Sequence, residues 1–259
     1  MRRRGWVLSA AVLIGSALQT ASAATLAILG ASGDELFLVD SDSAKLIDTL
    51  DLDSGSGPVV LNTMAVLPSE GRLIGVTIDK AIVEIDRSNG FVRRIATLGV
   101  VALPPSSMAC DPVEKKCRLV SFFDGGQATF SPSTGQASVG KNLGYKKGGS
   151  QPKVAAIGYT NATDGAKNTE LFDVDVATKS LYVQNGDGAK LSKVGKLGVN
   201  LDSLRVGFAI SYNSKSKKNA AYLVFKKKLY AVDLKKGAAS KGKAVGGLPA
   251  EIKAMAVLP

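Results

Sequence analysis

The pentapeptide Met-Ala-Val-Leu-Pro occurs twice in this chain, at residues 64–68 and again at residues 255–259. Three more strand-like runs follow the first copy, whereas the given sequence stops after the second. A terminal strand without neighbours leaves its backbone groups unpaired and its faces uncovered. Residues 25–50 contain three strand-like runs and lack a first strand of their own. We therefore predict that the two ends of the chain share one sheet and close a ring, as the ends of β-propellers do.

Internal repeats support this prediction. Each repeat contains an apolar first strand and a turn residue at similar spacing, and three of the repeats also contain a glycine after the turn residue. The third strands end at Asp40, Asp86, Ser131, Asn185 and Asp233, which are 45 to 54 residues apart. In three repeats a glycine stands four residues later, as a hairpin with a left-handed residue requires. These glycines are Gly90, Gly135 and Gly237. A period of about 47 residues with four strands in each repeat is typical of propeller blades.

The predicted fold is therefore all-β, a five-bladed β-propeller with four-stranded antiparallel blades. One blade combines residues 252–259 with residues 25–50, and the others span residues 61–100, 105–144, 153–199 and 203–248. The fourth repeat is longest because it carries an extra loop at residues 161–168, rich in Thr, Asp, Gly and Asn. No stretch of a dozen residues after the first 23 sustains a helical period. Six blades, with the split blade counted differently, is the alternative.

Residues 1–23 have the pattern of an export signal. Three arginines precede an apolar stretch, and Ala-Ser-Ala at residues 21–23 is a cleavage sequence. The apolar stretch is shorter than the roughly 20 residues that span a membrane. Ordinary secretion and the twin-arginine route both remain open. We expect residues 24–259 to form a single domain, periplasmic or secreted, without a membrane span and monomeric.

Two cysteines, Cys110 and Cys117, flank a short polar segment between two strand-like runs. In an oxidising compartment they would form a disulfide across a hairpin. Two packed thiols are the alternative.

Catalytic chemistry has few candidates, because the sequence contains no histidine. Histidine-based nucleophilic catalysis and histidine metal sites are thereby excluded. Glycoside hydrolysis needs two converging carboxylates, and the predicted inner strands carry only Asp111, at a strand end before a proline. Asp111 is accordingly interpreted as a turn residue. We expect no catalytic residues, no metal and no cofactor.

Positive charge is concentrated in the second half of the chain. Residues 24–140 contain 9 Lys and Arg against 14 Asp and Glu, whereas residues 141–259 contain 21 against 8. Because consecutive strands alternate in direction, the lysines divide between the two faces of the ring. One face receives Lys215, Lys217, Lys218, Lys235 and Lys236, and the other receives Lys226, Lys227 and Lys228 together with Lys146 and Lys147.

Two interpretations of these lysines remain open. They either keep the protein soluble or contact a polyanion weakly, such as an acidic polysaccharide, lipid headgroups or a cell-wall polymer. A groove that follows a nucleic-acid backbone would gather charge on one face among stacking aromatic residues. We therefore expect no specific nucleic-acid partner.

The ends of the inner strands supply a candidate ligand site at the mouth of the axial funnel, where propellers commonly bind ligands. A polar and aromatic set converges there, suited to hydrogen bonding and stacking. Its members are Asp111, Tyr159, Asn161, Tyr212 and Asn213. The alternative is that Tyr and Asn simply end the strands.

Several short segments of this chain resemble an exported bacterial family known as domain of unknown function 4394. They are Glu-Leu-Phe-Leu-Val-Asp at residues 35–40, Lys-Leu-Tyr-Ala-Val-Asp at 228–233, Ala-Ile-Gly-Tyr-Thr-Asn at 156–161 and Val-Gly-Lys-Leu-Gly-Val at 194–199. The resemblance covers essentially all of residues 24–259. It implies a propeller-like repeat fold and no established activity or functional residues. The lysine-rich last repeats and the two cysteines depart from the family pattern.

The sequence thus predicts an exported, non-catalytic binding module whose ligand is an unidentified protein or carbohydrate. An envelope- or polyanion-associated structural protein is the alternative, and an enzyme that depends on carboxylates or a metal is a third.

Overall fold

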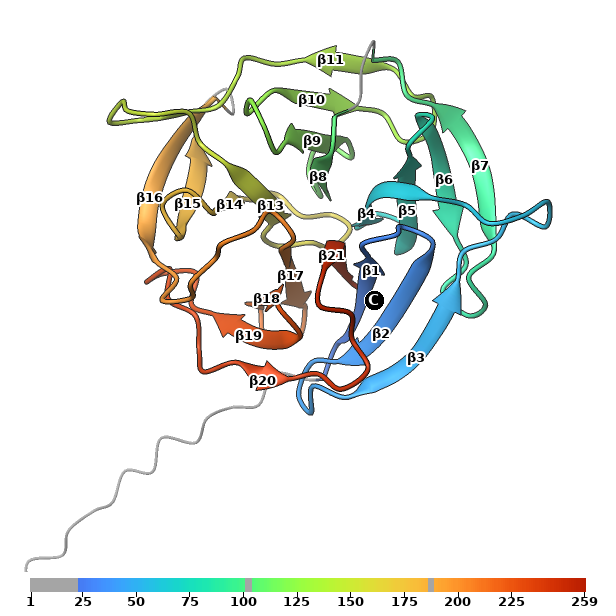
Figure 1. Ribbon diagram of the computed structural model, residues 1–259. Coiled ribbons are helices and arrows are strands. Elements are labelled where there is room, and N and C mark those ends of the chain that lie inside the picture. Colours follow the sequence, from blue (N-terminus) through green and yellow to red (C-terminus); the bar gives the residue numbers. More distant parts are fainter. Residues whose placement is uncertain (1–22, 101–103, 186–188) are drawn as a thin grey trace, which may run out of the picture.

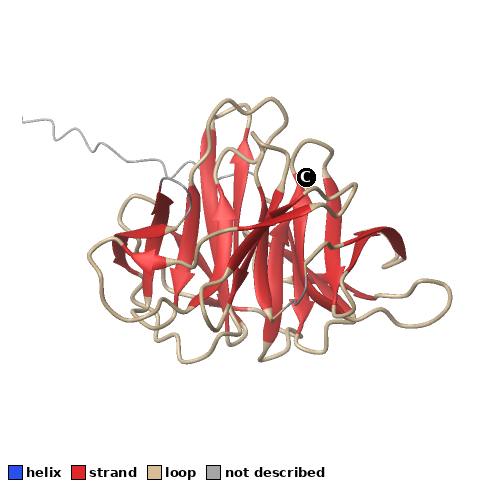
Figure 2. Cartoon of the chain, turned by 90° about the horizontal axis from the view of Figure 1, so that it is seen from above, coloured by secondary structure: helices blue, strands red, loops and turns tan. Residues whose placement is uncertain are grey.

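The computed structural model describes residues 23–100, 104–185 and 189–259. Five antiparallel sheets stand around a central axis, and the described residues contain no helix (Figures 1 and 2). The predicted five-bladed propeller is confirmed. The predicted export signal lies outside the described residues except for Ala23.

The first blade joins the two ends of the chain, as the repeated pentapeptide predicts. Its strand order is β21-β1-β2-β3, and Figure 1 shows the red β21 beside the blue β1. Strand β21 pairs antiparallel with β1, with Met255 opposite Ile28. The hydrogen bond from Leu258 N to Thr25 O, at 2.8 Å, extends the pairing by one step. The strands of this blade are β21 (Ile252–Val257), β1 (Thr25–Gly30), β2 (Glu35–Asp40) and β3 (Leu46–Asp51).

Each remaining blade is a contiguous stretch of chain. The second is β4 (Leu61–Leu67), β5 (Arg72–Thr77), β6 (Ala81–Ile85) and β7 (Val92–Thr97), and the third is β8 (Ser106–Cys110), β9 (Cys117–Ser121), β10 (Gln127–Phe130) and β11 (Ala137–Val139). The fourth is β13 (Val154–Tyr159), β14 (Leu171–Asp175), β15 (Ser180–Asn185) and β16 (Lys190–Lys196), and the fifth is β17 (Gly207–Asn213), β18 (Lys218–Phe225), β19 (Lys228–Val232) and β20 (Lys243–Ala244).

One boundary differs from the prediction. The sequence predicts that the third blade extends to residue 144, but its fourth strand ends at Val139, and Gly144 belongs to a separate short strand, β12 (Gly144–Tyr145). Strand β12 pairs in parallel with β16 of the next blade. The reason is the side chain of Tyr145, whose hydroxyl donates a hydrogen bond to the Asp175 carboxylate at 2.5 Å. This contact fixes the connector to the fourth blade.

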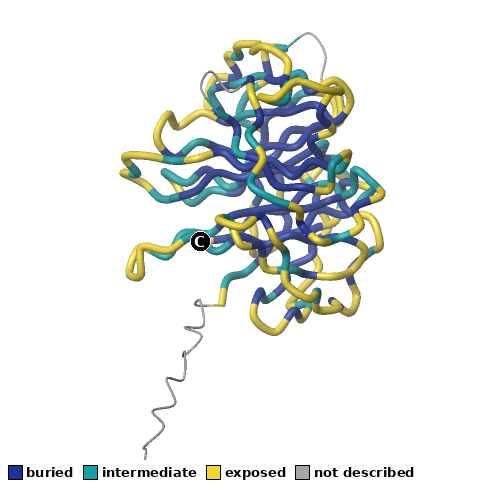
Figure 3. Tube along the Cα trace, turned by 90° about the vertical axis from the view of Figure 1, so that its left-hand side faces the viewer, coloured by how far each residue is buried: buried dark blue, intermediate teal, exposed yellow. Residues whose placement is uncertain are grey.

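The core consists of five hydrophobic clusters, one between each pair of neighbouring blades. Each inner strand also contacts the inner strands of both neighbouring blades. Figure 3 shows the buried strands inside and the exposed loops outside. Because each sheet lies between two others, both faces of its first two strands are covered. This position explains the continuously apolar first strands of the sequence.

The turns between third and fourth strands repeat one local design. Asp86 Oδ1 accepts hydrogen bonds from the backbone and side chain of Ser88, and these donors lower the pKa of Asp86. The three glycines predicted to be left-handed have φ of 77°, 75° and 70°. A Cβ on Gly135 would overlap the carbonyl oxygen of Thr97 in the preceding blade, and Gly99 N donates to Gly135 O at 2.8 Å. The glycine therefore serves both the turn and the contact between blades.

Candidate functional site

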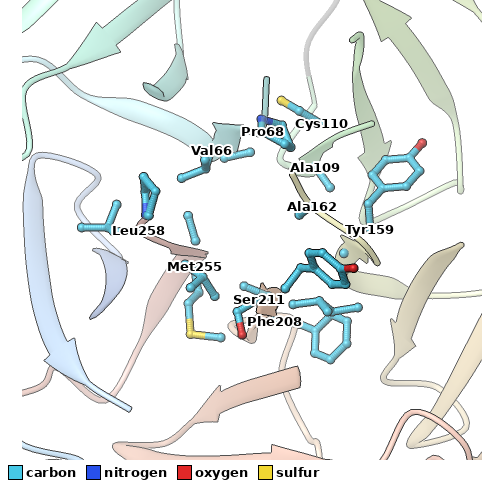
Figure 4. Close-up of a pocket in the computed structure, with 18 of the residues that line it drawn as sticks. Val66, Pro68, Ala109, Cys110, Tyr159, Ala162, Phe208, Ser211, Met255 and Leu258 are labelled. Carbon is cyan, nitrogen blue, oxygen red and sulfur yellow. The ribbon is translucent and has the colours of Figure 1, made fainter. Parts of the chain in front are cut away.

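The candidate site is a pocket of about 260 Å³ on the axis of the ring. All five inner strands, β4, β8, β13, β17 and β21, contribute to it, and it opens where these strands end (Figure 4). Both copies of the repeated pentapeptide line it, with Val66 from one and Val257 from the other. The ring closure therefore builds the pocket as well as the first blade.

Small and apolar side chains dominate the lining. Four alanines stand at matching positions of four inner strands, and Gly158 occupies the same region on the fifth. A Cβ on Gly158 would lie 3.2 Å from the Phe208 ring, so larger residues there would close the space. None of the described residues that line the pocket is Asp, Glu, Lys or Arg. The alanines are Ala65, Ala109, Ala209 and Ala256.

Two of the five residues predicted for the funnel line this pocket, namely Tyr159 and Tyr212. The Tyr159 ring points away from the axis (Figure 4), and its hydroxyl accepts a hydrogen bond from Arg118 Nε at 3.1 Å. Burial raises the pKa of Tyr159, and the nearby Arg118 guanidinium opposes this effect. The phenol hydroxyl of Tyr159 is therefore engaged within the wall. Tyr212 is partly exposed.

The other three predicted residues do not line the pocket; their side chains organise turns around its mouth. Asp111 accepts hydrogen bonds from Val113 N and Glu114 N at 2.7 and 3.0 Å, and Asn213 accepts one from Ser216 N at 2.9 Å. Asn161 bonds to Asn168, at the other end of its own loop, and to Asn219 on β18. The geometry agrees with the alternative reading of these residues as strand-ending polar groups, and ligand binding by the set stays a prediction.

A buried polar network lies between the third and fourth blades. Arg118 donates to Gln127 Oε1 at 2.5 Å as well as to Tyr159, and Gln184 Nε2 donates to the same Gln127 oxygen at 2.9 Å. Asp173 is fully buried beside this network, and neither of its carboxylate oxygens has a hydrogen-bond partner among the described residues. Burial raises the pKa of Asp173 well above its usual value, although Arg118 opposes the shift.

Asp175, two residues along the same face of β14, has the opposite environment. It is also fully buried, but its oxygens accept hydrogen bonds from Lys153 N, Ala177 N, the Thr178 hydroxyl and the Tyr145 hydroxyl at 2.5–3.1 Å. Burial and the Asp175 carboxylate together raise the pKa of Tyr145. Asp175 is thus a structural anchor.

Sequence reasoning missed these acids and Arg118. The alternation in Leu-Phe-Asp-Val-Asp at residues 171–175 is typical of a strand with one wet face. A second strand of a propeller blade has none, however, because neighbouring blades cover both sides. The available signal was position: Asp173 lies in the middle of a second strand, where neighbouring blades cover both faces.

The predicted disulfide is present between Cys110 and Cys117. It joins the start of β9 to the end of β8, and Cys110 also lines the pocket. The bond fixes the hairpin that bears Arg118 in its second strand. It thereby holds the wall that contains Tyr159.

The predicted anion-contact lysines lie at opposite ends of the fifth blade. Lys215 and Lys217 lie in the turn between β17 and β18, Lys218 begins β18, and Lys235 and Lys236 follow β19 on the same face. Lys226 and Lys227 form the turn between β18 and β19 on the other face, and Lys228 begins β19. Lys226 pairs with Asp202 at 2.6 Å and lies over the Phe225 ring. The positive charge is therefore divided between two faces, and contact with a polyanion stays a prediction.

The ring and its axial pocket place this chain among the five-bladed β-propellers. The sequence profile of the family described as domain of unknown function (DUF4394) matches residues 35–256, and the chain belongs to this family. The resemblance noted from short motifs is thereby confirmed. A comparison with curated protein sequences gives no significant match. In the described part of the chain, no helix is long and apolar enough to cross a membrane.

Solved structures share the fold at low sequence identity. A protein of unknown function from Bacteroides thetaiotaomicron is 15% identical with a TM-score of 0.52; the match covers 90% of this chain and 62% of that one. A chain of a nidogen–laminin complex is 12% identical with a TM-score of 0.50, covering 92% of this chain and 85% of that one. At these identities, the likeness concerns the fold.

Proposed function

We propose that this protein is an exported, non-catalytic binding module that holds its ligand in the axial pocket. The observation that carries the proposal is the pocket itself, built by all five inner strands and lined without carboxylates or amines. Such a lining offers binding surface and none of the carboxylates or amines that commonly serve as general acids and bases. The two acids that are fully buried, Asp173 and Asp175, lie between blades and not on the axis.

Two further observations support the proposal. The disulfide is of the kind that persists in oxidising compartments, in agreement with the export signal predicted at residues 1–23. A chain with a similar fold occurs in a nidogen–laminin complex, so a propeller of this kind is compatible with a role in molecular recognition.

The test is a ligand screen with a pocket-blocking variant. Val66 lines the pocket and is partly exposed, so Val66→Trp should fill it. Ile47→Trp, on the outer strand β3 where Ile47 is 56% exposed, is the matched control. Thermal-shift screening of small molecules, glycans and peptides should yield ligands that bind wild type and Ile47→Trp but not Val66→Trp. A set of ligands that bind all three proteins equally well would reject the axial pocket as the site.

A further inference from the structure

The loop at residues 161–168 gives the pocket its most individual feature. In the other blades with a contiguous chain, the first and second strands are joined by shorter turns: four residues at 68–71, six at 111–116 and four at 214–217. Here β13 ends at Tyr159 and β14 begins at Leu171. The longer connection contributes Ala162 and Thr163 to the pocket lining. Among the other turns of this kind, the one at residues 68–71 also contributes lining residues, Pro68 and Gly71.

The base of this loop is fixed by hydrogen bonds. Asn161 N donates to Asn219 Oδ1 at 2.7 Å, and Asn219 Nδ2 donates back to Asn161 Oδ1 at 3.0 Å. Asn161 Nδ2 also donates to the backbone and side-chain oxygens of Asn168 at 3.0 and 2.9 Å. Asn161 has a φ of 52°, a conformation that asparagine tolerates better than most residues. These bonds close the loop on itself and tie it to the fifth blade.

The tip of the loop extends in the other direction, toward the third blade. Asp164 forms an ion pair with Lys115 at 3.5 Å, and both side chains are more than 60% exposed. Exposed pairs of this kind are weak. A Cβ on Gly165 would meet nothing within 4 Å, so the tip is not packed. The loop thus spans the mouth between the third and fifth blades, with a firm base and a weakly held tip.

The pocket beneath the loop favours uncharged ligands. Its lining provides no charged partner, so a charged ligand would lose its hydration without compensation. Ser211, Tyr212 and Thr163 are the hydroxyl-bearing residues of the lining other than Tyr159. They suit one or two polar atoms on a molecule that is otherwise apolar. Met108, Met255 and Phe208 offer soft and aromatic surface for a ring.

We propose that the axial pocket takes a small, uncharged and largely apolar molecule, and that the 161–168 loop sets the largest molecule that enters. The proposal rests on the axial pocket being the binding site. It assigns the size limit to Ala162 and Thr163, which come from a loop, whereas the inner strands provide a mostly apolar wall.

The experiment uses three probes on the full chain: indole, its charged analogue indole-3-carboxylate, and the larger neutral N-phenyl-1-naphthylamine. Dissociation constants are measured by fluorescence or calorimetry. Wild type should bind indole at least about tenfold more tightly than either other probe, a discrimination that a fitted apolar pocket can supply. Equal or tighter binding of indole-3-carboxylate, or failure of indole to bind, would overturn the proposed ligand class.

Two variants test the loop. Replacement of residues 162–167 by Gly-Gly keeps Asn161 and Asn168 and leaves a tight hairpin. It should lower the ratio of the N-phenyl-1-naphthylamine dissociation constant to the indole dissociation constant about tenfold. Ala162→Trp leaves the loop length intact and should weaken indole binding about tenfold, whereas Ala166→Trp, on the same loop but outside the lining, should not. If both the shortened loop and Ala162→Trp leave indole binding and the size ratio unchanged, the loop does not determine specificity.

The Val66→Trp variant separates this result from failure of the proposed function. Loss of indole binding in Val66→Trp places the probe on the axis. Indole binding at wild-type affinity in Val66→Trp would reject the axial site itself, and the inference about the loop with it.

Discussion

Closure of the ring can be tested with two methionines that begin identical pentapeptides. Met64 and Met255 each stand first in a Met-Ala-Val-Leu-Pro segment, with exposures of 0% and 4%. Met64 belongs to a blade made of contiguous chain, whereas Met255 is held in β21, which joins β1 only across the ends of the chain. If β21 is a full member of its blade, both side chains pack in the core between blades, and Met255 lines the axial pocket as well.

The expected cost of each truncation follows from this burial. Replacing a buried methionine by alanine removes apolar contacts and leaves a cavity, which costs about 2–5 kcal/mol. Met255→Ala and Met64→Ala should therefore lower the free energy of unfolding by amounts within about 1 kcal/mol of each other. Total stabilities of domains are about 5–15 kcal/mol, so both changes are large enough to measure.

The assay is urea unfolding followed by far-ultraviolet circular dichroism. Tryptophan fluorescence would not report on the propeller, because the only tryptophan, Trp6, lies in the predicted signal. Both variants should keep a single transition with the wild-type slope, since the same surface is exposed on unfolding. A loss below about 0.5 kcal/mol for Met255→Ala alongside a full loss for Met64→Ala would show that β21 is a loosely attached tail. The reasoning about ring closure would then be wrong.

Three further predictions concern contacts between blades and the disulfide within the third blade, and each has its own measurement. Gly135→Ala should lower the free energy of unfolding by at least about 2 kcal/mol, because φ is 75° and the new Cβ overlaps Thr97 O. The control is Gly165→Ala, where φ is 71° and the surrounding space is open; it should cost only about 1 kcal/mol, measured by urea unfolding. The pKa of Asp173 is raised in the folded state above its ordinary value of 3.8, so wild type should lose stability relative to Asp173→Asn as the pH rises above that value. Below that value, the unfolding free energies of the two proteins should depend on pH in the same way. A difference in unfolding free energy that does not change with pH would contradict this. Replacing Cys110 and Cys117 by serine should lower unfolding free energy by roughly 2–3 kcal/mol, because the disulfide closes a short loop, and equal thermal midpoints for both proteins would refute it.

The propeller could be predicted from the sequence because its signals are local and repeated. The turn residues Asp40, Asp86 and Asp233 form side-chain hydrogen bonds within their own turns, so their spacing carries structural information without any tertiary contact. The apolar first strands are equally direct, since every inner strand lies in the same covered position. Ring closure followed because a strand missing at one end of the chain matched a surplus strand at the other.

The candidate site was less accessible to sequence reasoning, because its residues act across blades. The position of Tyr159 at a strand end predicts a place at the mouth of the pocket. The direction in which its hydroxyl points, however, depends on a hydrogen bond from Arg118, 41 residues away. The placement of Gly144 in the third blade has a similar cause. Its neighbour Tyr145 bonds to Asp175, which lies 30 residues further on, and no local pattern indicates that contact.

The packing that closes the ring also explains why its loops, more than its strands, should determine what this protein binds. Five inner strands converge on one axis, and a Cβ on Gly207 would lie 2.8 Å from Met255 Cβ. Such crowding favours small residues at equivalent positions of the inner strands, as at Ala65, Ala109, Ala209 and Ala256. Crowding ends at the turns that follow the inner strands, so these turns have room to differ in length. In this chain, the turn that departs furthest from the others is the loop at residues 161–168, and it adds Ala162 and Thr163 to the pocket lining.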